Sequence, residues 1–212
     1  MNKKALFFDN DGILVDTEKY YFEATKIILA EEGIFLTQED YINYFLLQSK
    51  GAWFLLEEKG YNKLMIAELR NKRNQLYNSM LQSQKLLIEG VQESIKKLCG
   101  KFKLAIVTSS RKDHFETIHK STELLKYFDF VLTREDYLES KPNPEPYLLA
   151  LKKSGFTNAD CLIIEDSPRG LQAALSAGID CCVIPTELTK DCDFSGAKLK
   201  LNFLGEIFDY LG

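Results

Sequence analysis

The chain has 212 residues, of which 45% are hydrophobic and 27% charged, and its formal net charge is -4 at pH 7. This composition is that of an ordinary globular protein, with room for one good core or for a core domain carrying a smaller insertion. It lacks the basic balance typical of nucleic-acid binding and any apolar run long enough to cross a bilayer, so we expect neither nucleic-acid nor membrane partners.

The five cysteines follow no disulfide framework and include no Cys-x-x-Cys pair, so we expect reduced thiols rather than disulfides or a zinc site. Cys181 and Cys182 lie in an apolar run that fits a buried strand. The first strand already carries acidic residues that cleavage of a signal peptide would remove. We therefore expect a cytoplasmic location, with a monomer as the default state.

The first predicted element is a short buried strand, Ala5–Phe8, followed by two carboxylates one residue apart. Asp9 and Asp11 would lie at the carboxyl end of a sheet, where open α/β folds bind ligands. Gly12 permits a sharp turn there. Two neighbouring acids repel one another unless a cation or a shared proton relieves them. An Asp- and Asn-rich turn that only closes the strand is the alternative interpretation.

Residues 17–85 show helical periodicity and almost no strand signals, with Tyr20, Ala24 and Ile27 at helical spacing and Gly33 suited to end the first helix. From about residue 86, short apolar runs alternate with helical segments. The apolar runs are Leu104–Val107, Phe128–Leu132, Cys161–Ile164 and Cys181–Ile184.

This alternation predicts an α/β fold, a Rossmann-like parallel sheet with helices on both faces. The strand at residues 5–8 would belong to the same sheet. We therefore predict a core domain of residues 1–16 and 86–212. The insertion, residues 17–85, is predicted to be an all-helical domain that covers the carboxyl ends of the strands as a cap.

Two further polar segments are candidates for anion binding. Thr108, Ser109 and Ser110 follow a predicted strand and open a helix, where hydroxyl and backbone N–H groups bind anions. A plain helix cap uses the same groups. Lys141 lies in a proline-rich loop before a helix expected to begin near Glu145. Its charge could meet a phosphate or lie between acids, although a solvated lysine is the commoner role.

A second predicted strand also ends in two acids. Glu165 and Asp166 follow the apolar run 161–164, and Ser167 is suited to cap a helix that stops at Gly178. Acids at the ends of two parallel strands offer only oxygen ligands. Such a set is typical of a site for a hard cation such as Mg²⁺.

Taken in order, these segments carry a family resemblance. Asp9-x-Asp11-Gly, then Thr108 after an apolar strand, then Lys141-Pro, then Glu165-Asp resembles the four motifs of the haloacid dehalogenase superfamily. Each motif alone is modest, but the four in this order are specific. The chain is similar to the branch with a helical cap inserted after the first motif, which includes many small phosphatases and β-phosphoglucomutase.

The resemblance implies a magnesium-dependent phosphoryl transfer. It makes Asp9 the nucleophile that becomes an aspartyl-phosphate, and Asp11 the acid and base. The side chains of Asp9 and Asp166 would bind Mg²⁺ together with the backbone carbonyl of Asp11. Glu165 would join directly or through water.

The phosphoryl oxygens would be bound by Thr108, by Lys141 and by the backbone N–H of Ser109. The expected function is hydrolysis of a small phosphorylated metabolite, such as a sugar phosphate. Two alternatives stay open. One is a phosphomutase on the same scaffold, and the other is a phosphoryl-binding protein that has lost turnover.

Some positions depart from the family pattern. Asn10 stands where an apolar residue is usual, and a buried amide without partners costs roughly 1–3 kcal/mol. Asp11 disfavours dehalogenase activity, because the dehalogenases of the superfamily lack an acid there. Tyr21 stands where the β-phosphoglucomutase pattern has a histidine, which disfavours the mutase.

Substrate choice is expected to lie in the helical insertion. Gln48, Lys50 and Trp53 fall where relatives present a specificity loop. Lys50 could bind a second anionic group and Trp53 could stack on a ring, although a solvated lysine and a buried tryptophan are the simpler roles. His114 and His119 are the two histidines of the chain and have no metal-pair spacing, so we expect ordinary helix residues.

Overall fold

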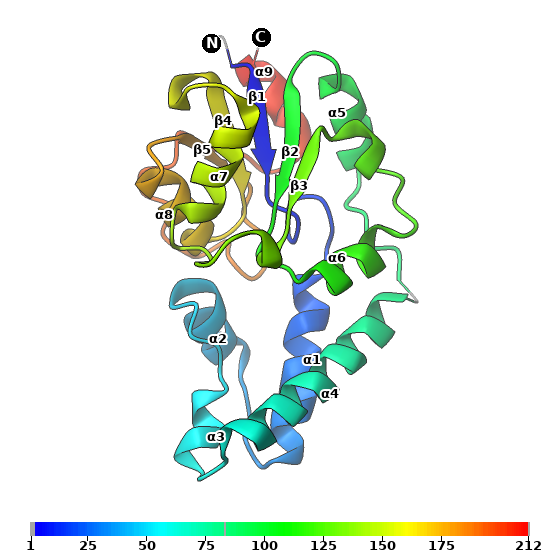
Figure 1. The fold of residues 1–212 in the computed structure, drawn as a ribbon, viewed down its shortest axis with the longest axis vertical. Coiled ribbons are helices and arrows are strands. Elements are labelled where there is room, and N and C mark those ends of the chain that lie inside the picture. Colours follow the sequence, from blue (N-terminus) through cyan, green and yellow to red (C-terminus); the bar gives the residue numbers. More distant parts are fainter. Residues whose placement is uncertain (1–2, 83, 212) are drawn as a thin grey trace. The chain divides into compact units, whose positions relative to one another are not determined.

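The computed structural model describes residues 3–82 and 84–211. The chain divides into two compact units, one made of Met1–Asp16 and Leu86–Gly212 and the other of Thr17–Lys85. Figure 1 shows the elements of both. No helix in the described part of the chain is long and apolar enough to cross a membrane.

The first unit contains a six-stranded parallel sheet in the order β3-β2-β1-β4-β5-β6. Its strands are β1 (Ala5–Phe8), β2 (Lys103–Val107), β3 (Phe130–Leu132), β4 (Cys161–Glu165), β5 (Asp180–Val183) and β6 (Leu199–Lys200). The predicted α/β class is confirmed. The short β6 was not predicted, because a two-residue strand carries no periodicity.

Helices cover both faces of this sheet. They are α5 (Val91–Leu98), α6 (Lys112–His119), α7 (Glu145–Ser154), α8 (Pro168–Ser176) and α9 (Ile207–Leu211), with single 3₁₀ turns η2 (Leu125–Tyr127), η3 (Arg134–Asp136), η4 (Asn158–Asp160) and η5 (Leu204–Glu206). Figure 1 shows α7 and α8 on one side of the sheet and α5 on the other.

Two helix starts follow from their local sequence. The Ser167 hydroxyl caps α8 by accepting from the backbone N–H of Gly170 at 3.3 Å, and Pro168 occupies the first turn. The chain leaves this helix through Gly178, whose φ of +68° is readily adopted by glycine. Helix α7 begins at Glu145, where the proline-rich loop ends. Both starts were predicted.

Strands β1, β2 and β4 are apolar except for Lys103 at the start of β2 and Glu165 at the end of β4, because both faces of the sheet are covered. Phe7, Val107 and Ile163 share one face and pack with Tyr147 of α7 and Leu171 of α8 in a single buried cluster. The alternate residues of β1, β2 and β4 are just as deeply buried. This packing holds the strand ends rigidly at one edge of the sheet.

The second unit is built of helices alone among its described residues. Its elements are α1 (Glu18–Glu31), α2 (Gln38–Tyr41), the π-helical η1 (Ile42–Leu47), α3 (Phe54–Glu58) and α4 (Lys63–Gln82). Helices α1 and α4 pack together, with the rings of Tyr21 and Tyr77 edge to face at 5.2 Å. The ring of Tyr41 stacks on that of Phe45 at 4.5 Å. Aromatic packing therefore supplies much of this unit's own core.

We predict that Phe7→Ala lowers the free energy of unfolding of the first unit by about 3–5 kcal/mol, because the ring is 0% exposed and its removal leaves a cavity. Urea denaturation would measure the loss. The matched control is Phe203→Ala in the same unit, whose side chain is 58% exposed and whose loss should stay below about 1 kcal/mol. Equal losses for the two variants would contradict the prediction.

Candidate active site

The order of the strands brings the predicted motifs to one edge of the sheet. Strand β1 lies between β2 and β4, with Phe8 in register with Ile106 and Ile164. The residues that follow these three strands therefore emerge side by side. They are Asp9 to Asp11 after β1, Thr108 to Ser110 after β2, and Asp166 after Glu165, the last residue of β4.

Lys141, from the loop before α7, is buried among these acids. Its ammonium donates to Asp9 Oδ1 at 2.8 Å, to Glu165 Oε1 at 2.7 Å and to the carbonyl of Val107 at 2.8 Å. Burial alone would lower the pKa of Lys141, but the carboxylates of Asp9 and Glu165 outweigh it and hold that pKa above its ordinary value. Lys141 is therefore a fixed positive charge between two acids.

Glu165 is fully buried, and the protein itself satisfies both of its oxygens. Oε1 accepts from Lys141 and from the Tyr147 hydroxyl at 2.5 Å, and Oε2 accepts from the Asp166 N–H at 3.2 Å and the Ser167 hydroxyl at 3.3 Å. A Cβ at Gly170 would collide with this carboxylate. The main effect of Glu165 in this arrangement is to orient Lys141.

The acids of β1 and β4 form a group that suits a metal ion. Asp9, Glu165 and Asp166 each offer a carboxylate oxygen, and these oxygens lie within 4.8 Å of one another. Gly12, at a φ of +83°, passes so close to Asp166 that a Cβ there would overlap its carboxylate. Three clustered carboxylates match the oxygen ligands that Mg²⁺ prefers.

The charge balance of the site also favours a bound metal ion. Burial raises the pKa of Asp9 to about 7, Lys141 opposes this rise, and the carboxylates of Glu165 and Asp11 add to it. The single lysine therefore does not supply enough positive charge for Asp9 to ionise easily. A divalent cation beside these acids would favour the ionised form, so the residues present fit the metal that the family resemblance implies.

The carboxylate of Asp11 is held by the hydroxyl groups of Ser110 and Thr108. Its Oδ2 accepts from Ser110 Oγ at 2.7 Å and from Thr108 Oγ1 at 3.3 Å. Thr108 Oγ1 in turn accepts from the Ser110 N–H at 3.0 Å. The contact from Ser110 was not predicted: its position after β2 signalled a polar corner but not which hydroxyl would reach the acid.

Ser109 lies between these two hydroxyl residues. Within residues 3–82 and 84–211, its backbone N–H has no hydrogen-bond acceptor, so this donor is open to a ligand. The neighbouring Thr108 carbonyl accepts from the Tyr137 hydroxyl at 2.7 Å, which anchors the turn. The corner therefore presents a backbone donor on a rigid support.

Asn10, the unusual residue between the two acids, has found partners. It is 0% exposed, and its Oδ1 accepts from His119 Nε2 at 2.7 Å. The other ring nitrogen, Nδ1, lies 2.8 Å from Thr122 Oγ1. His119 was expected to be an ordinary helix residue of α6. It is instead a buried hydrogen-bonding group joined to the first motif.

The remaining candidates belong to the helical unit and are described within it. Gln48 is exposed and donates to Asn43 Oδ1 at 2.8 Å. Lys50 is exposed as well, with its ammonium 3.6 Å from the centroid of the Phe54 ring. Trp53 is 6% exposed and packs inside the unit, so its part in specificity stays a prediction.

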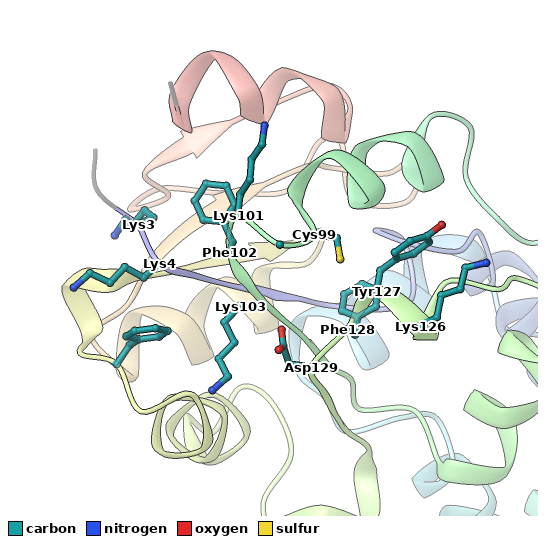
Figure 2. Close-up of a pocket in the computed structure, with 12 residues that line it drawn as sticks. Lys3, Lys4, Cys99, Lys101, Phe102, Lys103, Lys126, Tyr127, Phe128 and Asp129 are labelled. Atoms are coloured by element: carbon teal, nitrogen blue, oxygen red, sulfur yellow. The ribbon is translucent and has the colours of Figure 1, made fainter.

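A hollow of about 710 Å³ lies at the opposite, amino-terminal edge of the sheet (Figure 2). Its lysines are Lys3, Lys4, Lys101, Lys103 and Lys126. Three of them already pair with acids of the protein, Lys3 with Asp180 at 2.9 Å, Lys4 with Asp160 at 2.8 Å and Lys126 with Glu123 at 2.9 Å. Thr108, Ser109 and Lys141 are not among the residues that line this hollow, so it is not the predicted phosphate site.

Comparison with known proteins gives one consistent family. Residues 6–184 match the family model described as haloacid dehalogenase-like hydrolase. The protein CbbY of Rhodobacter capsulatus is 30% identical over 95% of this chain and 93% of its own length. The phosphorylated carbohydrates phosphatase of Thermotoga maritima is 29% identical over 84% of this chain and 82% of its own length.

A solved structure agrees with these sequence matches. The crystal structure of CbbY from Rhodobacter sphaeroides in complex with phosphate superimposes with a TM-score of 0.81 at 26% identity. The match covers 97% of this chain and 96% of that one.

His119 is predicted to make the protein less stable in acid. Burial lowers the pKa of His119 to about 4, against a smaller opposing effect of Asp11, whereas a histidine in the unfolded chain titrates near 6.5. As the pH falls from 6.5 to 4 the unfolded chain binds the proton first, so the free energy of unfolding should fall by up to roughly 3 kcal/mol. Urea denaturation across this range would measure it. His119→Gln should flatten the dependence, and identical slopes for both proteins would contradict the prediction.

Proposed function

The chain belongs to the haloacid dehalogenase-like hydrolase family, whose curated relatives include named phosphatases, and it is therefore an enzyme. We propose that it hydrolyses a small phosphate monoester with Mg²⁺ through an aspartyl-phosphate. A sugar phosphate or a related metabolite is the proposed substrate. The observation that carries the proposal is the buried contact of Lys141 with Asp9, beside the acids that close β4.

In the first proposed step, Asp9 attacks phosphorus. Lys141 holds Asp9 Oδ1, which leaves Oδ2 to form the new bond. The bond between phosphorus and the ester oxygen breaks, and the departing alcohol takes its proton from Asp11. The carboxylate thus divides one difficult displacement into two easier ones.

In the second proposed step, water attacks the phosphorus of the aspartyl-phosphate. Asp11 now accepts the water's proton, phosphate leaves, and the carboxylate of Asp9 is restored. The same residue can serve both steps because Asp11, having given up its proton in the first step, is able to accept one in the second. Its contacts with Thr108 and Ser110 hold its carboxylate in place.

The phosphoryl group itself would be bound at the end of β2. The open Ser109 N–H and the Thr108 hydroxyl are directed by the turn that follows the strand, and Lys141 adds its charge. Mg²⁺ would be held by Asp9 and Asp166, with Glu165 and the Asp11 carbonyl nearby. When bound, it would neutralise charge between the acids and the phosphate dianion.

The helical unit is proposed to act as the cap that selects the substrate. Lys50 and Gln48 are its exposed candidates, and Trp53, which is 6% exposed, is the candidate for stacking on a ring of the substrate. The relatives differ in what their names say they act on, and they include a fructose-1-phosphate phosphatase of Escherichia coli. The cytoplasmic location and the monomeric state stay predictions.

The direct test is phosphate release from a panel of phosphorylated metabolites, with Mg²⁺ and with chelator. We expect release with Mg²⁺ and its loss with chelator. Isomerisation of a sugar phosphate without release of inorganic phosphate would favour the mutase, and ³¹P NMR would detect it. Absence of both reactions would favour a binding protein.

Asp9→Asn is predicted to lower kcat by at least roughly a thousandfold, because an amide is a poor nucleophile toward phosphorus. The matched control is Asp191→Asn, an exposed acid of the same unit, which should keep the original kcat. Steady-state phosphate release measures both. An Asp9→Asn variant with unaltered turnover would remove Asp9 from the role of nucleophile.

Lys50→Met is predicted to raise KM for substrates with a second anionic group by roughly tenfold while leaving kcat within about twofold. Substrates with one phosphate and no other anion should be unaffected. Lys59→Met, on another exposed part of the same unit, is the control. Equal changes for both substrate classes would contradict a specificity role.

A further inference from the structure

We propose that His119 is a positioning residue for Asp11 and acts through Asn10. This inference rests on the proposed role of Asp11 as acid and base. Asn10 lies between the two: its Nδ2 donates to Asp11 Oδ2 at 3.3 Å, and its Oδ1 accepts from His119 Nε2 at 2.7 Å. All three residues belong to the first unit.

The amide of Asn10 determines the direction of these hydrogen bonds. Its nitrogen faces Asp11 and can only donate, and its oxygen faces His119. An amide oxygen only accepts, which makes His119 Nε2 the donor. The imidazole therefore carries its proton on Nε2 and keeps Nδ1 as an acceptor.

Thr122 completes the chain at its far end. Its Oγ1 accepts from the Leu124 N–H at 3.4 Å and lies 2.8 Å from His119 Nδ1. The hydroxyl also lies 3.5 Å from the His119 carbonyl, but its shorter contact is with Nδ1. Donation of the hydroxyl proton to Nδ1 supports the same tautomer. Donation therefore runs in one direction, from Thr122 through His119 and Asn10 to Asp11.

The surroundings of His119 keep its ring neutral, as this chain requires. The side chain is 5% exposed and packs against Phe115, with ring centroids 4.5 Å apart. Burial lowers the pKa of His119 to about 4, so the ring has one donor and one acceptor at neutral pH. A charged ring would have two donors and could not accept from Thr122.

The consequence for Asp11 is geometric. Asp11 Oδ2 accepts from Asn10, Thr108 and Ser110, which approach it from different segments. Donors from several directions restrict rotation of the carboxylate and so set where its other oxygen points. Small displacements of a catalytic group are costly in rate. The amide of Asn10 contributes to this restraint only while His119 holds it.

The network can be tested without any substrate. The chain has two histidines, so long-range ¹H–¹⁵N NMR with a His114→Gln variant for assignment identifies the His119 ring. We expect the Nε2–H tautomer at pH 7. We also expect Asn10→Leu to shift the His119 ring signals and not those of His114. An Nδ1–H tautomer, or His119 signals insensitive to Asn10→Leu, would overturn the proposal.

The positioning role is tested by kinetics. His119→Leu should lower kcat about tenfold with KM within about twofold, and His119→Gln, which restores an N–H donor, should recover most of kcat. In the Asn10→Leu background, His119→Leu should have no further effect. The matched control is His114→Leu on the same helix, with melting temperatures to verify that each variant folds.

The outcomes separate this inference from the proposed function. Equal losses of kcat from His119→Leu with and without Asn10 would show that His119 does not act through Asn10. If NMR shows the network in the unaltered protein but His119→Leu keeps the original kcat, the positioning role alone would be overturned. No turnover by the unaltered protein would overturn the proposed function and, with it, the catalytic meaning of the network.

Discussion

The ammonium of Lys141, buried between the carboxylates of Asp9 and Glu165, is the interaction on which the rest of the site depends. An ammonium removed from water must be paired, and each acid removed from water needs a donor. The three groups come from a loop, from the end of β1 and from the end of β4, so the fold must bring these segments together. Tyr147 of α7 extends the arrangement by donating to Glu165. Helix α7 is thereby linked to the Lys141 ammonium through Glu165.

The same charges explain why the site is suited to a divalent cation. Asp9, Asp11, Glu165 and Asp166 gather around a single lysine, and burial with this surplus of acids raises the pKa of Asp9. Such a site lacks positive charge, which a divalent cation would supply. Glu165 is already occupied by protein donors, whereas the N–H of Ser109 has no acceptor among the residues that the structure describes. The fold thus separates groups that hold the site together from groups left for a ligand.

Much of this could be predicted because the signals are local. Strands buried on both faces are mainly apolar, so β1, β2 and β4 could be predicted from short apolar runs. The acids after β1 and β4 were recognisable because strand ends are where ligands bind in such folds. The pairing of Asn10 with His119, 109 residues away, could not be predicted in this way. Neither residue's neighbours in the sequence indicate which distant helix packs against the end of β1.

The sequence by itself determined the α/β core, the helical insertion and the four motifs, because periodicity and strand-end position depend on residues close together in the chain. Only the tertiary structure decided which polar groups satisfy one another. It placed Ser110 on Asp11, Tyr147 on Glu165 and His119 on Asn10. A buried hydrogen bond depends on the packing of elements that are far apart in sequence, and several side chains of the right type could serve equally well. That choice is made by three-dimensional proximity, which local pattern does not encode.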